Sequence, residues 1–254
     1  MSIIIKTQEE IEKMRDGGHR LAGIMDEIGA SVAPGQNTHE IDELARRLIF
    51  DMDGIPIFEG YGGPENPYPG AVCASVNHEV VHGIPRRDRI LQEGDILKID
   101  IGMRYRGLIT DMARTYAVGK VPEVAWKLMK ATKESLDMGI DKLKSGARLS
   151  EYSAAVEGYV RSRGFSVIRE LVGHGVGHEL HEDPQIPNYK SNMKDIVLKE
   201  GMTLALEPMI NVGTEKIKLQ EDGWTYVTAD GKLSAHFEDT VVITKGGYEI
   251  LTRK

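Results

Sequence analysis

The sequence predicts an α+β protein, with antiparallel sheets that carry helices packed on one side. Segments with helical spacing of apolar residues precede strand-like segments, and this order occurs twice along the chain. Residues 104–107 fit a tight turn between two strand-like runs, which is typical of an antiparallel hairpin. Residues 35–42 and 146–153 are faintly similar at matching places. We therefore expect one domain of residues 1–254 built from two related halves, about 1–120 and 121–254.

Two helices are predicted in the first half. A capping box at Thr7 and Glu10 opens a helix whose apolar positions continue to about residue 28. Pro34 and Gly35 then break the chain, and Thr38 can cap a second helix over about residues 39–52. After a loop rich in Gly and Pro at residues 60–70, strands are expected at 71–76, 96–103 and 108–118.

The second half follows the same plan. Pro122 suits the first turn of a helix that continues to about residue 143. Gly146 breaks the chain, and a further helix starts at Leu149 or Ser150 and ends near residue 163. Asp230-Gly231 is typical of a hairpin turn between the last two strands. The expected strands are 167–172, 202–206, 224–228 and 234–244.

Composition excludes several classes of protein. A net charge of −7 argues against a general nucleic-acid binder. The single cysteine, Cys73, excludes an internal disulfide framework and fits a reducing cytoplasm. The start of the chain has no cationic region before its short apolar run, and no apolar stretch has the length of a membrane span. We expect a cytoplasmic protein without a membrane segment, and nothing in the sequence requires more than a monomer.

Five metal-type residues interrupt apolar, strand-like runs: Asp100, Asp111, His174, Glu207 and Glu238. An ionised carboxylate in such a run loses its water at a large cost in free energy. Each acid alone is more often a turn or salt-bridge residue than a ligand, but the whole set needs one common explanation. A shared pair of divalent cations would neutralise the acids, and this donor mix suits Mn²⁺, Fe²⁺, Co²⁺ or Zn²⁺.

Small residues lie two positions from three of these acids, at Gly102, Ala113 and Ala205. Residues two apart in a strand share a face, so these positions would leave space for ions, water and substrate. The alternative is that they are chance small residues in a tight sheet.

Two further histidines, His82 and His181, stand in tight turns near this set. Their alternative interpretation is that of hydrogen-bonded turn histidines. His178 and His181 resemble a zincin helix, but their spacing of three differs from the spacing of four that such a helix needs. No environment that would activate the thiol of Cys73 can be recognised, so a small buried residue is the better interpretation.

The residues at this point resemble a known family. Asp100 and Asp111, together with His174, Glu207-Pro-Met and Glu238, are similar to the five metal ligands of the methionine aminopeptidases, which have the pita-bread fold. Residues 75–85 and 173–184 resemble the segments that carry that family's two catalytic histidines. The resemblance covers nearly the whole chain and is closest to the short bacterial type I form.

The resemblance implies a role for each residue. Asp100 would hold one metal ion, Asp111 and Glu238 would bridge two ions, and His174 and Glu207 would complete the site of the second. A water activated by both ions would attack the first peptide bond and release the initiator methionine from nascent proteins and peptides. The implied catalytic residues are His82, which would contact the scissile amide, His181, which would donate to the oxyanion, and Glu207, which would transfer the proton.

The resemblance also implies a pocket for the methionine side chain, formed by Cys73, Tyr68 and Trp224. Tyr68 is preferred to Tyr61 for this pocket, and a surface turn is the alternative for Trp224. The chain departs from the family pattern in a longer loop at residues 62–69 and at Leu180, His236 and Asp239.

Other functions compete with this one. A proline dipeptidase or an aminopeptidase acting before proline would keep the fold, but such relatives usually have an additional amino-terminal domain. A non-catalytic pita-bread protein that binds partners or RNA would typically have lost ligands, and here all five are present. A metal-stabilised structural protein is the third alternative. The expected partners are peptides with an amino-terminal methionine and nascent chains, with transient association with the ribosome and without stable binding of nucleic acid. The physiological metal and the preferred second residue of the substrate stay open.

Overall fold

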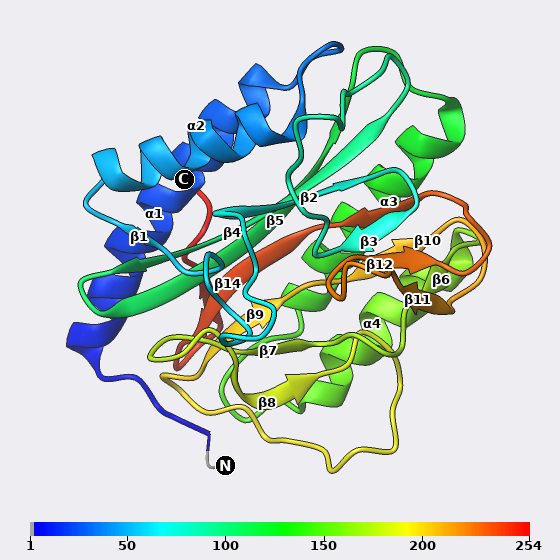
Figure 1. Ribbon diagram of the computed structural model, residues 1–254. Coiled ribbons are helices and arrows are strands. Elements are labelled where there is room, and N and C mark those ends of the chain that lie inside the picture. Colours follow the sequence, from blue (N-terminus) through cyan, green and yellow to red (C-terminus); the bar gives the residue numbers. More distant parts are fainter. Residues whose placement is uncertain (1–2) are drawn as a thin grey trace.

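A curled, antiparallel, nine-stranded sheet is the centre of the computed structural model, which describes residues 3–254; Met1 and Ser2 of the predicted domain lie outside it. The strand order is β1-β4-β5-β14-β9-β7-β8, with β2 beside β4 and β15 beside β14 (Figure 1). Four helices are found in the described residues, and α1 and α2 pack against β5 and β2 (Figure 1). The helices are α1 (Gln8–Ser31), α2 (Thr38–Asp51), α3 (Glu123–Ile140) and α4 (Leu149–Ser162).

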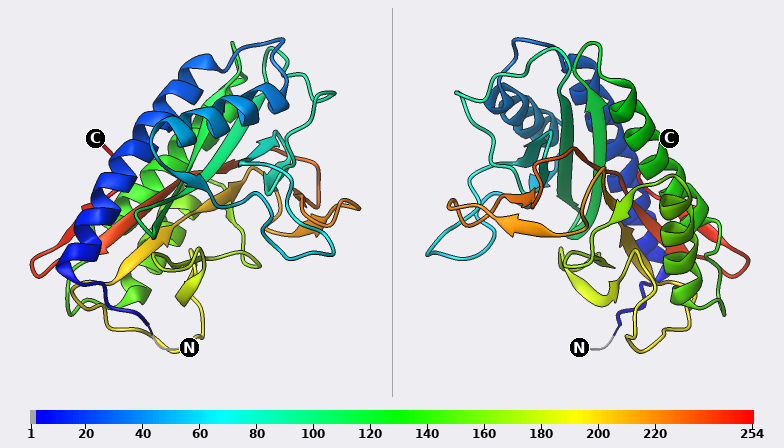
Figure 2. Two further views of the ribbon diagram at one scale, coloured as in Figure 1. Left: turned by 60° about the vertical axis from the view of Figure 1, so that its left-hand side comes forward. Right: turned by 90° about the vertical axis from the view of Figure 1, so that its right-hand side faces the viewer.

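Two smaller three-stranded sheets, β13-β10-β6 and β11-β12-β3, complete the fold. In both views of Figure 2 the β11-β12-β3 sheet projects from the side of the molecule away from α1. The strands are β1 (Ile55–Pro56), β2 (Val72–Val76), β3 (Glu79–Val81), β4 (Ile96–Tyr105), β5 (Leu108–Ala117), β6 (Ser166–Val167), β7 (Gly173–Gly175), β8 (Glu182–Ile186), β9 (Thr203–Leu206), β10 (Met209–Asn211), β11 (Ile217–Leu219), β12 (Tyr226–Thr228), β13 (Ser234–His236), β14 (Glu238–Ile243) and β15 (Tyr248–Ile250).

The helix starts follow from side-chain capping. Thr7 accepts a hydrogen bond from the backbone of Glu10, and the Glu10 carboxylate accepts one from the backbone of Thr7, so the predicted capping box is confirmed. The predicted cap of the second helix is wrong by one residue. Asn37 caps α2, because its side chain accepts from the backbone of Glu40, whereas the Thr38 hydroxyl bonds to the backbone of Arg86.

The hairpin of β4 and β5 is confirmed, and it fixes the relative position of the two aspartates. Arg106 and Gly107 form its turn with φ values of +48° and +84°, as in the type I′ turns that match the twist of antiparallel strands. Gly102 pairs with Asp111, and Asp100 pairs with Ala113. Residues paired in this way, and residues two apart on one strand, share a face. Both aspartates therefore point to the same side of the sheet.

Several strand predictions are wrong where the chain changes sheets. Only Val167 of the expected strand 167–172 lies in a strand, β6, which pairs with β10. The expected strand 234–244 is two strands, since the chain leaves the β10 sheet at Phe237 and enters the large sheet as β14. Asp230-Gly231 is a turn but joins no hairpin: β12 pairs with β11 and β3, whereas β13 pairs with β10. The Asp230 carboxylate instead accepts from the backbone of Thr214 and Lys232.

The core divides along the chain. One large apolar cluster contains buried residues of α1, α2, β2 and β4, and another contains buried residues of α3, α4, β9 and β14. A third cluster joins the two, with Ile11 and Tyr68 from the first half and Val176 and Leu180 from the second. Each half thus has its own core, and the third cluster lies at the site described next. That the two halves arose by duplication stays a prediction.

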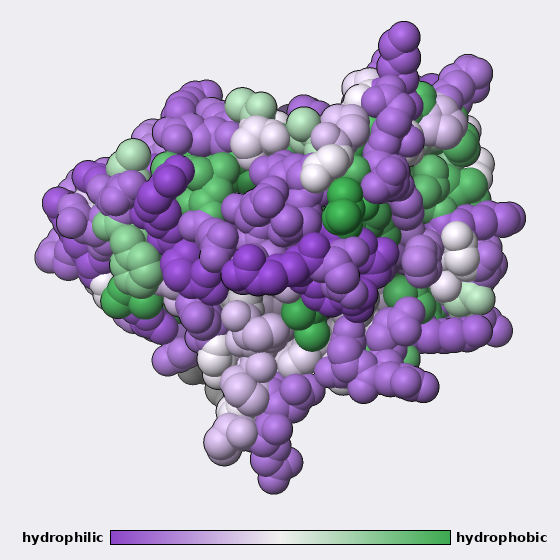
Figure 3. Space-filling view, turned by 45° about the horizontal axis from the view of Figure 1, so that its top comes forward, coloured by the Kyte–Doolittle hydropathy of each residue, from purple (hydrophilic) through white to green (hydrophobic). Residues whose placement is uncertain are grey.

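The surface is mainly polar. The face in Figure 3 is mostly hydrophilic, and its hydrophobic side chains lie in small separate groups. Among the helices of residues 3–254, none has the length and apolar character needed to cross a lipid bilayer.

Candidate metal and substrate site

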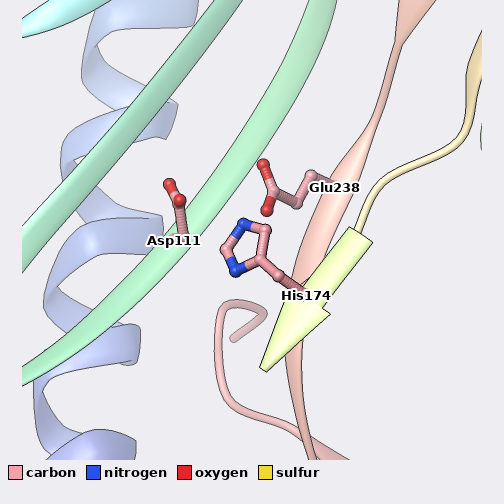
Figure 4. Close-up of side chains that lie close together, drawn as sticks. All are labelled: Asp111, His174 and Glu238. Carbon is pink, nitrogen blue, oxygen red and sulfur yellow. The ribbon is translucent and has the colours of Figure 1, made fainter. Parts of the chain in front are cut away.

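The five predicted metal ligands come together at the middle of the large sheet. Asp100 lies on β4, Asp111 on β5, His174 on β7 and Glu238 at the start of β14, and Glu207 directly follows β9. Glu238 pairs with Ala113 of β5, and His174 pairs with Ala205 of β9, so neighbouring strands bring these side chains into one cluster. In Figure 4, Asp111, His174 and Glu238 point toward one another from three different strands.

The spacing of these groups fits a metal ion. One ligand atom from each of Asp111, His174 and Glu238 lies within 4.8 Å of the others. His174 Nε2 lies 3.5 Å from Glu207 Oε1, which places Glu207 beside the same group. Three carboxylate oxygens in the cluster are buried and have no hydrogen-bond partner among the described residues: Asp100 Oδ1, Asp111 Oδ1 and Glu238 Oε1. Buried polar atoms rarely stay unpaired, so these oxygens are well suited to a cation.

Burial controls the ionisation of the cluster. Loss of water raises the pKa of Asp100 to about 7 and that of Glu207 to about 8. The pKa values of Asp111 and Glu238 lie well above their usual range, first because of burial and then because carboxylates lie nearby. Burial lowers the pKa of His174 to about 3, so its imidazole is neutral and has a free lone pair. A cation among the four acids would lower these pKa values and stabilise the ionised carboxylates.

A buried cavity of about 80 Å³ opens beside this cluster, several times the ~10–15 Å³ that a single water needs. All ten residues singled out from the sequence line it, and so do three further residues with apolar or aromatic side chains: Phe58, Tyr61 and Leu180. Leu180 had been noted only as a departure from the family pattern. Phe58 was missed, since an aromatic residue before a Gly-rich loop gives no signal that separates a cavity wall from ordinary core.

Aromatic rings form one wall of the cavity. The Tyr68 hydroxyl is buried and donates to the carbonyl oxygens of Gly83 and Val72, and its ring packs edge-on against Trp224 with 5.2 Å between centroids. Trp224 is half-buried against this wall, in contrast to the alternative of a surface turn. Tyr61 lies at the same cavity, and its hydroxyl is 2.7 Å from His181 Nδ1. Both tyrosines therefore border the space, by different contacts.

His82 and His181 face the cavity from two loops. His82 follows β3 with a φ of +58°, a left-handed conformation that residues other than glycine seldom adopt except where the surroundings hold them. Burial lowers the pKa of His82 to about 4, and it also lowers the pKa of His181. The rings of His181 and His174 are 4.5 Å apart. Two neutral imidazoles thus lie next to the acidic cluster and can exchange hydrogen bonds with a bound molecule.

One prediction about space is wrong. A Cβ atom on Gly102 would lie 2.6 Å from Ile57 Cδ1 and 3.0 Å from Phe58 Cε1, so apolar side chains fill the room beside this glycine. Gly102 therefore leaves space for the side chains of Ile57 and Phe58 rather than for ions or water.

The surroundings of His178 and of the Cys73 thiol agree with the interpretation that neither group acts in catalysis. His178 Nε2 lies 3.1 Å from Glu10 Oε1 with a partly exposed side chain, and it does not line the cavity in the described structure. Burial raises the pKa of the Cys73 thiol well above its usual range, which disfavours a thiolate nucleophile.

A family comparison agrees with this geometry. The sequence model of metallopeptidase family M24 matches residues 12–245. The chain belongs to metallopeptidase family M24. It is 48% identical to methionine aminopeptidase 1 of Bacillus subtilis over 251 residues, or 99% of both chains. It is 46% identical to the methionine aminopeptidase of Clostridium acetobutylicum over 98% of both chains.

Solved structures of M24 proteins have the same fold. The crystal structure of methionine aminopeptidase from Thermotoga maritima covers the whole of both chains, with a TM-score of 0.95 and 45% identity. Prolidase from Pyrococcus furiosus has a TM-score of 0.77 at 24% identity over 99% of this chain and 66% of that chain, a likeness that shows the fold alone. The expected α+β, pita-bread architecture is therefore confirmed.

Proposed function

We propose that the chain is a methionine aminopeptidase that removes the amino-terminal methionine from peptides and nascent proteins in the cytoplasm. The observation that carries this proposal is that five residues of metal-binding types, two neutral histidines and an aromatic wall all border one cavity. The 48% identity to methionine aminopeptidase 1 of Bacillus subtilis, over nearly the whole length of both chains, supports the same activity.

The acids and His174 would hold two divalent cations. Asp100 would bind one ion, Asp111 and Glu238 would bridge, and His174 and Glu207 would bind the second ion, which uses every member of the cluster. Bound there, Mn²⁺, Fe²⁺, Co²⁺ or Zn²⁺ would supply a water of lowered pKa and polarise the scissile carbonyl. The unpaired oxygens of Asp100, Asp111 and Glu238 support this assignment.

Glu207 is our candidate for the group that moves the proton. Its carboxyl group is buried and its pKa is raised to about 8, so it can hold a proton near neutral pH. In the proposed reaction Glu207 takes a proton from the attacking water and delivers it to the leaving amine. A general acid–base residue works best when its pKa is close to the working pH, which is the condition that burial creates here.

The two histidines would stabilise the reacting peptide. His181 Nδ1 is bonded to the hydroxyl of Tyr61, which leaves Nε2 to donate to the oxygen of the scissile carbonyl as negative charge develops there. His82, on the other side of the cavity and held in a left-handed conformation, would contact the scissile amide. Both histidines are neutral, so each can donate one hydrogen without bringing a positive charge close to the metal ions.

The apolar wall would select the first residue of the substrate. Tyr68, Cys73 and Trp224 lie beside Phe58 and Leu180 in a narrow space. Methionine is unbranched and polarisable, and its sulfur makes favourable contacts with aromatic rings, so it suits such a wall better than a branched side chain.

The test is release of the first residue from three peptides: Met-Ala-Ser, Leu-Ala-Ser and Ala-Pro. Each is incubated with metal-stripped protein and again after Mn²⁺, Co²⁺ or Fe²⁺ has been added. We expect metal-dependent release of methionine alone. Cleavage of the proline peptide would assign the chain to proline-directed peptidases. Binding of two ions per chain without cleavage of any peptide would point to a non-catalytic protein.

A further inference from the structure

His236 is a buried histidine that the proposed reaction does not use. It ends β13, two residues before Glu238, and its side chain is 1% exposed. Both ring nitrogens are buried and have no hydrogen-bond partner among residues 3–254. The side chain does not line the cavity, so His236 lies behind the acids rather than facing a substrate. A polar ring in such a place is costly unless it interacts with a neighbouring group.

The nearest acidic neighbour of His236 is Glu207. His236 Nε2 lies 3.5 Å from Glu207 Oε2, and 4.0 Å from Glu238 Oε2. His174 Nε2 lies 3.5 Å from the other Glu207 oxygen, Oε1. The Glu207 carboxylate thus lies between two imidazoles, with one oxygen toward the cavity ligand His174 and the other toward His236.

Two hydrogen bonds hold the backbone of His236 in place. The backbone nitrogen of His236 donates to Thr115 Oγ1 over 3.0 Å, and the Thr115 hydroxyl donates back to the carbonyl of His236 over 2.6 Å. These two bonds tie β13 to β5, the strand that carries Asp111. The backbone of His236 is therefore held in place, whereas the longer Glu207 side chain has rotatable bonds by which its carboxylate can move toward either neighbour.

We propose that His236 is a positioning residue, whose Nε2 hydrogen bonds to Glu207 Oε2 and leaves Oε1 to bind a cation together with His174. The inference rests on the proposed metal-binding role of Glu207. A small movement of the carboxylate shortens 3.5 Å to the ~2.9 Å of a normal hydrogen bond.

The chemistry of the ring agrees with this role. An imidazole carries an N–H on at least one ring nitrogen, so His236 Nε2 can donate to the Glu207 oxygen 3.5 Å away. Such a donor can hold one carboxylate oxygen and leave the other for the cation. Partners of this kind fix the orientation of a ligating group, and their loss typically costs 10–100-fold in metal affinity.

The test is calorimetric titration of Mn²⁺ into the metal-free full-length chain and its variants, which needs no peptidase assay. His236→Leu fills the space without a donor, and we expect its affinity for one ion to fall by about 10–100-fold. His236→Gln can place an amide N–H at the same oxygen, and it should keep most of the affinity. His178→Leu is the matched control, because His178 lies outside the cluster, and it should titrate like the unaltered chain.

The melting temperature of each metal-free variant separates positioning from packing. We expect His236→Leu to melt no lower than the unaltered chain, because leucine brings no unpaired polar atom into the core. If that variant does not fold, His236→Gln and His236→Asn give the same comparison, since the shorter amide of asparagine cannot reach Glu207.

Three results would overturn the inference. The first is unaltered Mn²⁺ affinity in His236→Leu or His236→Asn. The second is a Mn²⁺ affinity of His236→Gln as low as that of His236→Leu or His236→Asn. The third is a fall in metal-free melting temperature that accompanies the fall in affinity, which would show a packing role. If the unaltered chain binds no Mn²⁺, the proposed function itself is wrong and the inference is overturned with it.

Discussion

Glu207 has two proposed roles, because it would bind a cation and also transfer the proton. It is buried, its pKa is raised to about 8, and its oxygens lie 3.5 Å from His174 and 3.5 Å from His236. Glutamine has the same shape and could still occupy the place, but it cannot take a proton from water. The two proposed roles of Glu207 can therefore be separated by a single isosteric substitution.

We predict that Glu207→Gln lowers kcat for methionine release by about 10²–10⁴-fold, the usual contribution of a general acid–base group. The measurement is steady-state release of methionine from Met-Ala-Ser with saturating Mn²⁺, together with circular dichroism to verify the fold. Glu221→Gln, at an exposed glutamate, is the matched control and should retain full activity. Full activity in Glu207→Gln would contradict the assignment of the proton to this residue.

The raised carboxyl pKa values also predict how metal binding depends on pH. Asp100 and Glu207, with pKa values of about 7 and about 8, hold protons in the metal-free protein below those values. A metal ion must displace these protons, whereas His174, with a pKa of about 3, has none to lose near neutral pH. Metal affinity should therefore rise with pH between about pH 6 and pH 8.

Calorimetric titration of Mn²⁺ at pH 6.0, 7.0 and 8.5 measures this trend. Repetition in buffers of different ionisation enthalpy counts the protons that are released. We expect more protons to be released at pH 6.0 than at pH 8.5, because Asp100 and Glu207 lose theirs between these values. An affinity that stays flat, or falls as the pH rises, would show that the acids are ionised before the metal binds.

At the residue scale, site residues are predicted best from the sequence where a polar residue interrupts an apolar run. The five ligands were recognised because each is a polar residue in an apolar strand-like run, and the structure brings all of them to one cavity. Phe58 could not be recognised, because an aromatic residue in an apolar setting is ordinary. The space beside Gly102 was wrongly predicted, since the Ile57 and Phe58 that fill it come from a segment more than forty residues earlier in the chain.

At the scale of elements, Asp42 links α2 to the start of β2. Its side chain is 2% exposed, and Oδ1 accepts from the backbone nitrogens of Ala71 and Val72 at 2.6 and 3.1 Å. Arg46, one turn later on α2, lies 3.0 Å from the other oxygen. Val72 begins the strand on which Cys73 pairs with Asp100, so a helix carboxylate fixes the strand next to the metal ligands.

We predict that Asp42→Ala is destabilising, because two buried N–H groups lose their acceptor at about 1–3 kcal/mol each. For a chain of this size a loss of 1 kcal/mol lowers the melting temperature by about 2–4 °C, so a fall of roughly 4–20 °C follows. Thermal unfolding by circular dichroism measures it. Glu43→Ala changes the exposed neighbour on the same helix and should have a small effect. Equal melting temperatures of the two variants would contradict the proposed link.

Sequence predicts long elements well and short ones poorly. The four helices and the β4–β5 hairpin are confirmed, because each is long enough to show a period and has a cap or turn of its own. Strands of two or three residues, such as β6, cannot show an alternation. The break at Phe237 was missed because no Gly or Pro marks it, and only pairing with different sheets separates β13 from β14.

At the scale of the whole molecule, the candidate metal site joins the two halves of the chain. Asp100 and Asp111 belong to the first half, whereas His174, Glu207 and Glu238 belong to the second. The apolar cluster around the cavity likewise draws residues from both halves, although each half has a large cluster of its own. Without cations, burial and neighbouring carboxylates raise the pKa values of these acids, which favours their protonated forms at this junction. With cations, the same acids would connect the halves.

Metal ions should therefore stabilise the entire fold and not only the active site. An ion present at 100 times its dissociation constant stabilises the protein that binds it by about 2.7 kcal/mol. For a chain of this length that is a rise of roughly 5–10 °C in melting temperature for each ion. We predict such a rise when Mn²⁺ is added to metal-stripped protein, and its reversal by a chelator.

Differential scanning calorimetry of the stripped and loaded protein measures the effect, and a double variant identifies its source. Asp111→Asn with Glu238→Gln removes the charges of the two proposed bridging acids while it keeps their size. Because these acids come from different halves, we expect the double variant to lose most of the rise that Mn²⁺ produces. In the metal-free state it should melt close to the temperature of the unaltered chain, since the raised pKa values already favour the protonated, uncharged form of both acids. A full Mn²⁺-dependent rise in the double variant would mean that the ions bind elsewhere and that the halves are held together by apolar packing alone.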